Sequence, residues 1–299
     1  MGVSLLLMIA SFGLALWILN GHRSRGTRCL VLALVLCDLY AFDWSALNRA
    51  QAAAKGADEL DRLTRLEGAA GFLKSREGPF RVQMAMNAPP NAGDAFGIQT
   101  TWGAGVTLLR NYDQTRGLTN LFNVRYTIKP ASAGEPGAVY QDASWKIYEN
   151  PAAGPRAWLV HETTVEESPN FNPRKRALLA RPLETALDPA GDPAAESVNI
   201  DGYRPEAIEL SVKTQGRALL VLSEVFYPGW QATVNGQRAA IVEVDRALRG
   251  IPVPSGESRV VVAYRPGSVA AGAALTLISF CLLPVALLWL RRRPTPDGS

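Results

Sequence analysis

The stretch from 218 to 244 reads ALLVLSEVFYPGWQATVNGQRAAIVEV, and its short β-rich runs are separated by turn residues. Two of these runs, Gln231–Val234 and Ala239–Val244, lie on either side of Asn235-Gly236. Asn-Gly is the dipeptide that a two-residue hairpin prefers, because both turn positions need a positive φ. The stretch therefore predicts an antiparallel hairpin inside a sheet domain.

The same pattern of short strands and turns continues on both sides of this stretch. Ala207–Val212 and Ser258–Tyr264 are further β-rich runs, and Pro254–Gly256 supplies another turn. Short strands at such spacing are typical of an antiparallel sandwich, which we expect over residues 207–266. The residues before it, 166–206, are expected to hold connecting strands and a linker.

The region from 48 to 165 has a mixed pattern and predicts both helix and strand. Apolar residues recur there at the three- to four-residue spacing of an amphipathic helix from Leu60 to Leu73, and Gly78-Pro79 follows. Leu121–Ile128 and Ser144–Tyr148 are rich in β-forming residues. We therefore expect a mixed α/β region before the sandwich.

Three apolar runs, Val3–Leu19, Cys29–Leu47 and Val269–Leu290, stand apart from the rest of the chain. Each is close to the roughly 20 residues that cross a hydrocarbon core as a helix. We expect a transmembrane helix hairpin over residues 1–47 and a third transmembrane helix over 267–291. The predicted fold class is membrane-anchored α+β, with three transmembrane helices and an extracytoplasmic domain that contains the β-sandwich.

Two arginine clusters predict the orientation in the membrane. Arg23, Arg25 and Arg28 lie between the first two apolar runs, and Arg291–Arg293 follow the third. Cytoplasmic loops are enriched in Lys and Arg, so both clusters are expected inside. Residues 48–266 are then extracytoplasmic, and residues 292–299 form a cytoplasmic tail.

The net charge of +4 in a chain of 299 residues comes from these clusters. Without them the outer domain is formally neutral, and the sequence shows no continuous basic stripe of the kind that neutralises phosphates in nucleic acid. The three cysteines, Cys29, Cys37 and Cys281, all lie in the apolar runs. We therefore expect no nucleic-acid partner and no disulfide framework.

Asp38 and Asp43 are carboxylates in the second apolar run. An ionised carboxylate at the centre of a bilayer costs on the order of 3 kcal/mol or more unless it finds a partner or water. One interpretation is that Asp38 contacts another membrane helix or lines a cavity. The other is that the helix lies shallow, which would leave both residues close to the outer interface.

Glu224, Tyr227 and Trp230 are the candidate substrate-binding residues, in the string Glu224-Val-Phe-Tyr-Pro-Gly-Trp230. Aromatic rings beside a carboxylate can form a platform on which a sugar stacks. The alternative is that the aromatic residues pack at the end of the sandwich.

Catalytic and metal-binding patterns are missing from the sequence. His22 and His161 are its two histidines, which leaves no His/Cys metal cluster and no obvious His-based triad. No G-x-S-x-G, C-x-x-C or P-loop is present. We therefore expect no catalytic residue, no metal site and no cofactor.

An ordered set of short strings resembles the C-terminal third of YfhO-type bacterial membrane proteins. The strings are LKSREGPFRV (73–82), LFNVRYTI (121–128), YENP (148–151), PRAWLV (155–160), YPGW (227–230), NG (235–236), PSG (254–256) and YRP (264–266). Members of that family are similar to type C glycosyltransferases, which move a sugar from a polyprenyl-phosphate carrier to a cell-envelope polymer. In such enzymes the catalytic acid lies on the first outward loop, which has no counterpart here.

The resemblance implies a multi-pass protein of the bacterial cytoplasmic membrane. Its implied role is the non-catalytic C-terminal part of a glycosyltransferase-like protein, with the outer domain positioning the acceptor near a membrane active site. The alternative is an independent membrane-anchored module that binds an envelope glycan or a partner protein. The implied partners are the lipid bilayer, the rest of a multi-spanning membrane bundle, and an envelope glycan or polyprenyl-phosphate sugar.

Overall fold

The computed structural model describes residues 56–101, 103, 118–167 and 171–291, together with the single positions Gly26, Cys29, Ala33, Leu36, Cys37 and Tyr40. The chain falls into two compact units, Met1–Glu67 and Gly68–Ser299. In the first unit, α3 (Gly56–Thr64) is followed by Arg65, whose guanidinium pairs with Asp61 at 2.5 Å.

The second unit begins with a small sheet that one helix covers. Sheet 1 has the strand order β1-β2-β4-β3 and consists of β1 (Arg81–Gln83), β2 (Val124–Pro130), β4 (Trp145–Glu149) and β3 (Tyr140–Gln141). The β1–β2 pair is parallel, and the other pairs are antiparallel. From α4 (Glu67–Lys74), Phe72 contacts Tyr126 of β2 edge-on, with 6.4 Å between the ring centroids. The short helix α5 (Ala92–Phe96) lies between β1 and β2 in the chain.

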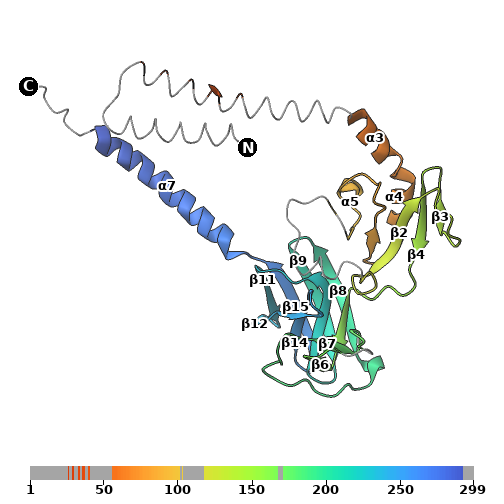
Figure 1. The fold of residues 1–299 in the computed structure, drawn as a ribbon. Helices are drawn as coiled ribbons and strands as arrows, with labels where there is room; N and C mark the ends of the chain where they lie inside the picture. The colour runs from red at the N-terminus through yellow and green to blue at the C-terminus, as the bar shows by residue number, and fades with distance from the viewer. Residues whose placement is uncertain are drawn as a thin grey trace, which may run out of the picture. The chain divides into compact units, whose positions relative to one another are not determined.

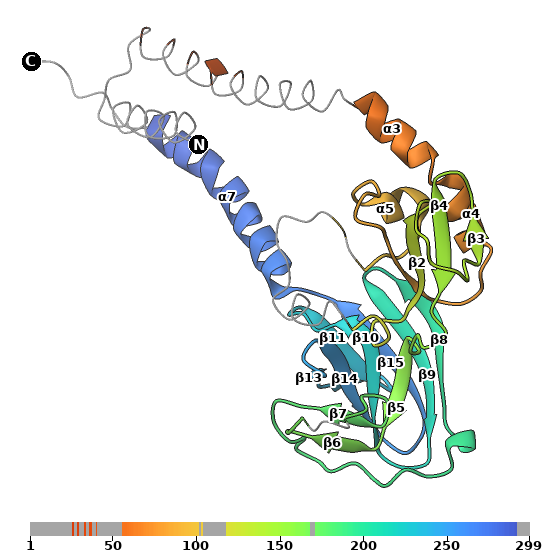
Figure 2. The same cartoon turned by 45° about the vertical axis from the view of Figure 1, so that its right-hand side comes forward.

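Two further sheets face each other as in a β-sandwich (Figures 1 and 2). Sheet 2 has the order β13-β14-β10-β5 and consists of β13 (Val242–Val244), β14 (Leu248–Val253), β10 (Ala218–Val225) and β5 (Ala157–Val160). Sheet 3 has the order β12-β11-β15-β9-β8 and consists of β12 (Gln237–Ala239), β11 (Trp230–Val234), β15 (Gly256–Tyr264), β9 (Ala207–Thr214) and β8 (Ser197–Arg204). All the pairs in both sheets are antiparallel.

The core between sheets 2 and 3 is built from alternate residues of facing strands. Leu210 of β9 and Val262 of β15 come from sheet 3, and Leu220 of β10 and Ile251 of β14 come from sheet 2. Side chains on a strand point alternately to its two faces, so a period of two places these residues together. This apolar layer holds the two sheets against each other.

Strand β10 is buried on both of its faces. Leu220 and Leu222 point into the core between the sheets, whereas Leu219 and Val221 belong to a second core with Trp158. Its apolar run has no polar alternation, which is typical of a strand covered on both sides. Sheet 2 is therefore the middle layer of the domain.

The predicted turn is confirmed at Asn235-Gly236, but the second strand of the hairpin is β12 (Gln237–Ala239) rather than Ala239–Val244, because Val242–Val244 pairs with β14 in sheet 2. The two turn residues have φ values of 52° and 80°. They connect β11 to β12, and Val234 pairs with Gln237 across the turn. This is the two-residue geometry in which both positions require positive φ.

The segment after β5 crosses over the outer face of sheet 2. Here β6 (Glu162–Thr164) and β7 (Arg176–Leu178) form a parallel pair, and Leu179 bridges to Val244 at the end of β13. The short 3-10 helix η1 (Pro193–Ala195) then leads into β8. The crossing brings residues 171–179 against the β13–β14 turn, where a pocket forms.

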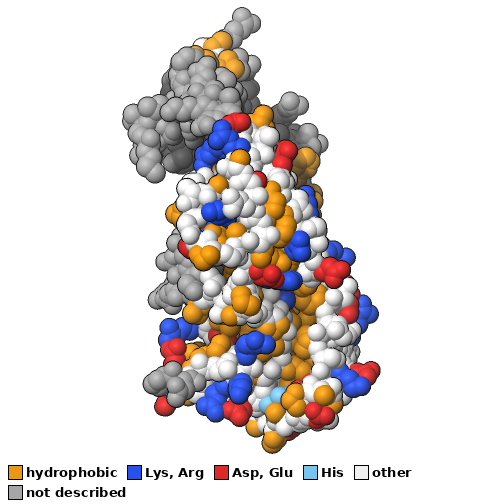
Figure 3. Space-filling model, turned by 90° about the vertical axis from the view of Figure 1, so that its right-hand side faces the viewer, with side chains coloured by type: hydrophobic (Ala, Val, Ile, Leu, Met, Phe, Trp, Pro, Cys, Tyr) orange, Lys and Arg blue, Asp and Glu red, His pale blue; other side chains and the backbone are white. Residues whose placement is uncertain are grey.

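Charged side chains are interspersed on the face shown in Figure 3. Among the described residues, Arg125 pairs with Glu149 at 2.9 Å and Arg259 with Glu209 at 2.9 Å. Exposed pairs of this kind contribute little to stability.

The expected transmembrane architecture needs correction. Within the part of the chain that the structure describes, no helix combines the length and apolar character that a membrane span requires. The third expected span coincides with α7 (Gly267–Arg291), but its side chains are described only as far as Leu282. The prediction of an α+β fold with three transmembrane helices is therefore wrong, and the described chain is mostly β-sheet with few helices.

Several predictions concern residues outside the described part of the chain. The first two apolar runs, Val3–Leu19 and Cys29–Leu47, lie outside it apart from single positions, and so do Asp38 and Asp43. The same holds for the expected cytoplasmic tail, residues 292–299.

Candidate functional site

Glu224, at the end of β10, lies in a cluster of buried polar side chains. Its Oε1 accepts hydrogen bonds from Arg156 Nε at 2.8 Å and from the Tyr203 hydroxyl at 3.0 Å. Its Oε2 pairs with Arg81 Nη2 at 2.9 Å. Arg81 comes from sheet 1, Glu224 from sheet 2 and Tyr203 from sheet 3. The carboxylate therefore joins three sheets.

The charge of Glu224 is fixed by its surroundings. Burial acts to raise its pKa, but the guanidinium groups of Arg81, Arg156 and Arg249 outweigh burial and hold the pKa below its usual range. The group is consequently an ionised hydrogen-bond acceptor at neutral pH. It is poorly suited to act as a general acid.

Trp230 contacts one cationic and one aromatic side chain. The Arg249 guanidinium lies 3.8 Å from the centre of the Trp230 ring, and the Tyr264 ring lies 5.3 Å from it. Tyr227 is 6.3 Å from Tyr264 and 42% exposed. Arg249 covers Trp230 in the way that a cation–π contact requires, which leaves less of the ring open for a sugar.

The structure brings the three sequence-predicted binding residues together. Glu224, Tyr227 and Trp230 line one cavity of about 320 Å³, along with Arg81 and Arg249. The sequence did not indicate the two arginines, because they come from β1 and β14. The two interpretations of Tyr227 and Trp230, a sugar platform or a packing element, both stay predictions.

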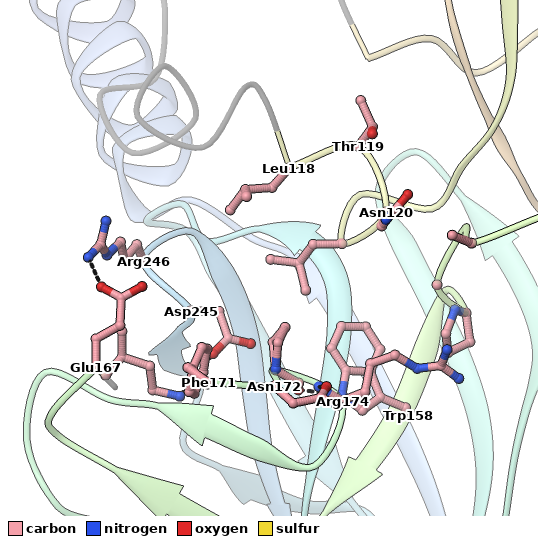
Figure 4. Close-up of a pocket in the computed structure, with 16 residues that line it drawn as sticks. Leu118, Thr119, Asn120, Trp158, Glu167, Phe171, Asn172, Arg174, Asp245 and Arg246 are labelled. Atoms are coloured by element: carbon pink, nitrogen blue, oxygen red, sulfur yellow. Dashed lines mark hydrogen bonds and ion pairs between the residues drawn. The ribbon is translucent and has the colours of Figure 1, made fainter. Parts of the chain in front are cut away.

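A larger pocket of about 620 Å³ lies under the crossing segment (Figure 4). Its apolar wall includes Trp158 and Phe171, and its polar groups include Asn120, Asn172 and Asp245. Small-molecule sites are mostly clefts of about 300–1,000 Å³ with apolar walls and a few well-placed polar groups. The pocket has both properties.

Asp245 is positioned by the turn between β13 and β14. Asp245 and Arg246 both have positive φ, at 52° and 67°, a conformation that Asp tolerates better than most residues. The Asp245 N–H donates to the Leu178 carbonyl at 2.9 Å, and the Leu178 N–H donates to Asp245 Oδ1 at 2.9 Å. These reciprocal bonds hold the carboxyl group at the pocket wall.

The second carboxyl oxygen of Asp245 is buried and unsatisfied. The residue is 4% exposed, and Oδ2 has no hydrogen-bond partner among the described residues. Burial raises the pKa of Asp245 to about 7, although the Leu178 N–H partly opposes this. The group can therefore accept a hydrogen bond as a carboxylate or donate one as an acid near neutral pH.

The rest of the pocket wall is held by local bonds. The Trp158 indole N–H donates to the Pro173 carbonyl at 3.1 Å, and the Arg174 N–H donates to Asn172 Oδ1 at 3.0 Å. On the rim, Arg246 forms an ion pair with Glu167. In Figure 4, Asp245 lies between this ion pair and Trp158.

Sequence reasoning missed Asp245. An Asp-Arg pair after a short strand is typical of an exposed turn, and neither the spacing nor the composition around Asp245 indicates burial. The residues that bury it lie at 158 and 171–178, well before it in the chain. The available signal was weak: a carboxylate between two β-rich runs.

Comparison with known proteins gave a family match over part of the chain. Residues 184–276 match the model of the family described as bacterial membrane protein YfhO. The expected resemblance to YfhO-type proteins is thereby confirmed, and the matched segment runs from before β8 into α7. No curated protein and no solved structure matched the chain.

Proposed function

We propose that this chain is a non-catalytic part of a membrane glycosyltransferase-like protein, and that its β-sheet domain holds an acceptor glycan of the cell envelope. The match to a bacterial membrane protein family supports the membrane location. The extracytoplasmic placement of the domain is part of this proposal, because an acceptor glycan of the cell envelope lies outside the cytoplasm.

The observation that carries the proposal is the unsatisfied Asp245 oxygen in the 620 Å³ pocket. A buried polar atom without a partner costs about 1–3 kcal/mol, which a ligand hydroxyl could recover. Asn120 and Asn172 supply further amide groups, and Trp158 and Phe171 supply ring surface for the apolar face of a sugar. This combination suits a neutral glycan better than a purely apolar ligand.

The pocket is assigned to binding because it lacks a free pair of carboxylates. Glycoside hydrolysis, for comparison, commonly uses two carboxyl groups placed around one bond. The other described carboxylate that lines the pocket, Glu167, is paired with Arg246 on the rim. Asp245 therefore acts as a single recognition group.

The test is calorimetric binding of cell-wall oligosaccharide fragments to the purified full chain. Asp245→Ala and Phe171→Ala should each weaken binding about tenfold, the equivalent of roughly 1.4 kcal/mol. Phe96→Ala is the matched control, because this phenylalanine of α5 does not line the pocket. Equal binding by all variants, or no binding of any fragment, would contradict the proposal.

A second measurement tests the non-catalytic assignment. The full chain is incubated with polyprenyl-phosphate-linked sugars and with the fragments that bind. Under the proposal the fragments bind without sugar transfer. Turnover by the purified chain would show that it contains its own catalytic groups.

A further inference from the structure

The buried cluster around Glu224 holds more positive than negative charge. Arg81, Arg156 and Arg249 all act electrostatically on this one carboxylate. Arg81 and Arg156 form ion pairs with Glu224, whereas Arg249 has no ion pair within the described ranges. Three guanidinium groups thus share one carboxylate.

Two of these arginines are deeply buried and incompletely hydrogen-bonded. Arg156 is 5% exposed and Arg249 is 4% exposed, and each has a buried Nη1 without a hydrogen-bond partner in the described part of the chain. Burial lowers the pKa of Arg249 to about 10. An uncompensated buried charge is costly, so an anion that reached it would be bound favourably.

Arg249 is held in place by contacts that do not neutralise it. Its Nε donates to the Val225 carbonyl at 2.9 Å, and its guanidinium plane lies over the Trp230 ring. These contacts leave the Nη groups available. A guanidinium is suited to binding an oxyanion through two parallel N–H bonds.

An open cavity lies beside this group. Arg249 and Arg81 line the space of about 320 Å³, together with Thr100, Thr101 and Tyr227. The volume is many times the roughly 30 Å³ that one water molecule occupies in the liquid. The cavity therefore has room for a tetrahedral or planar oxyanion.

We infer that this cavity is an oxyanion-binding site, in which Arg249 is the principal ligand for a phosphate or carboxylate group and Arg81 supplies a second positive charge. The site is separate from the Asp245 pocket, with which it shares no lining residue. It therefore goes beyond the proposed glycan binding. A structural role of the arginines alone would give no response to anions.

The experiment follows thermal unfolding of the purified full chain during titration with inorganic phosphate or glucuronate, at constant ionic strength. At least one of the two anions should raise the melting temperature of the wild type, because a ligand that binds only the folded state stabilises it. Arg249→Gln should weaken the apparent affinity at least tenfold. Arg259→Gln is the matched control, since this arginine of β15 is 72% exposed in its side chain and lies outside the cavity.

Arg249→Lys replaces Arg249→Gln in the experiment if the Gln variant does not fold. The Lys variant should also bind the anion more weakly, because it keeps the charge but loses the bidentate geometry. A response to phosphate alone identifies a phosphoryl ligand, and a response to glucuronate alone identifies a uronic acid; both support the site. No shift with either anion in the wild type, or equal shifts in the Arg249 variants, would overturn it. Asp245→Ala should leave the anion response unchanged, which separates this result from glycan binding.

Discussion

Asp245 shows how burial sets the chemistry of a single residue. Its carboxyl group has one satisfied oxygen and one unsatisfied oxygen, in a turn whose backbone conformation Asp and Asn both tolerate. Burial raises its pKa from 3.8 to about 7. The residue therefore prefers the neutral form in the folded chain at pH values where the unfolded chain is ionised.

This preference predicts a pH dependence of stability. Below about pH 4 Asp245 is protonated in both states, and between about pH 4 and 7 only the unfolded chain releases the proton. The contribution of Asp245 to the free energy of unfolding should fall by up to about 4 kcal/mol over that window and then stay level. Asp245→Asn should lack this fall and be more stable than the wild type at pH 8.

Denaturant unfolding at pH 4 to 8 measures the difference between wild type and variant. Asp201→Asn, which changes an exposed carboxyl of β8, is the control and should keep the slope of the wild type. If the free energy of unfolding of Asp245→Asn had the same pH slope as that of the wild type, the raised pKa of Asp245 would be contradicted.

Replacing Trp230 distinguishes a packing role of this side chain from a sugar-binding role. Trp230→Ala removes the ring that lies between Arg249 and Tyr264. Because the ring is only partly buried, we expect a loss of about 3 kcal/mol, the lower end of the range for large aromatic truncations. Thermal unfolding of the full chain measures this loss.

Tyr227→Ala provides the comparison, because Tyr227 is 42% exposed and its removal should change stability little. An unchanged melting temperature for Trp230→Ala together with lost glycan binding would indicate a sugar platform.

At the scale of elements, the β11–β12 hairpin depends on one backbone conformation. Gly236 has a φ of 80°, and a Cβ added there would meet no atom within 4 Å. Any effect of Gly236→Ala must therefore come from the backbone, where the left-handed conformation costs an L-residue roughly 1–2 kcal/mol.

We expect Gly236→Ala to lower the free energy of unfolding by about 1 kcal/mol, measured by denaturant titration. Gly134→Ala is a matched control, since that glycine also has open space around it but no positive φ. Gly134→Ala should leave the free energy of unfolding unchanged or raise it slightly, because alanine restricts the unfolded chain. A loss of the same size in both variants would contradict the assignment to the positive φ of Gly236.

At the scale of the whole molecule, the Glu224 cluster connects sheet 1 to sheets 2 and 3. Arg81 reaches from β1 to the Ser223 carbonyl of β10 at 2.6 Å, and Arg156 donates to the Tyr203 hydroxyl of β8 at 2.5 Å. Both arginines meet at one carboxylate. Glu224 is thus one residue through which all three sheets are linked.

Glu224→Gln should therefore destabilise the fold strongly, by about 3–5 kcal/mol, because it leaves buried guanidinium groups without a counter-charge. The pKa of Glu224 lies below its usual range. Its stabilisation is consequently present above the unfolded-state pKa of about 4.3 and is lost as the pH falls through the folded-state pKa.

Denaturant unfolding at pH 7 measures the loss of stability in Glu224→Gln. The exposed Glu257, which pairs loosely with Lys213 at 3.4 Å, supplies the control variant Glu257→Gln. A Glu224→Gln protein as stable as this control would show that the cluster is not a structural link.

The elements that sequence reasoning found are those that depend on neighbouring residues. The Asn235-Gly236 turn follows from two adjacent φ angles. Likewise, Leu66 and Leu73 are buried as the amphipathic spacing indicates, although the expected single helix is divided into α3 and α4. The expectation of three transmembrane helices was wrong, since no helix among the described residues has both the length and the apolar character to cross a membrane.

By itself the sequence determined the β-rich second half, its hairpin, the gathering of Glu224, Tyr227 and Trp230 near one turn, and the resemblance to YfhO-type proteins. These depend on residue type, spacing and order along the chain. The tertiary structure alone decided the burial of Asp245, the partners of Glu224 and the free charge of Arg249. Those properties come from side chains on strands far apart in sequence, and desolvation and ion pairing act through space.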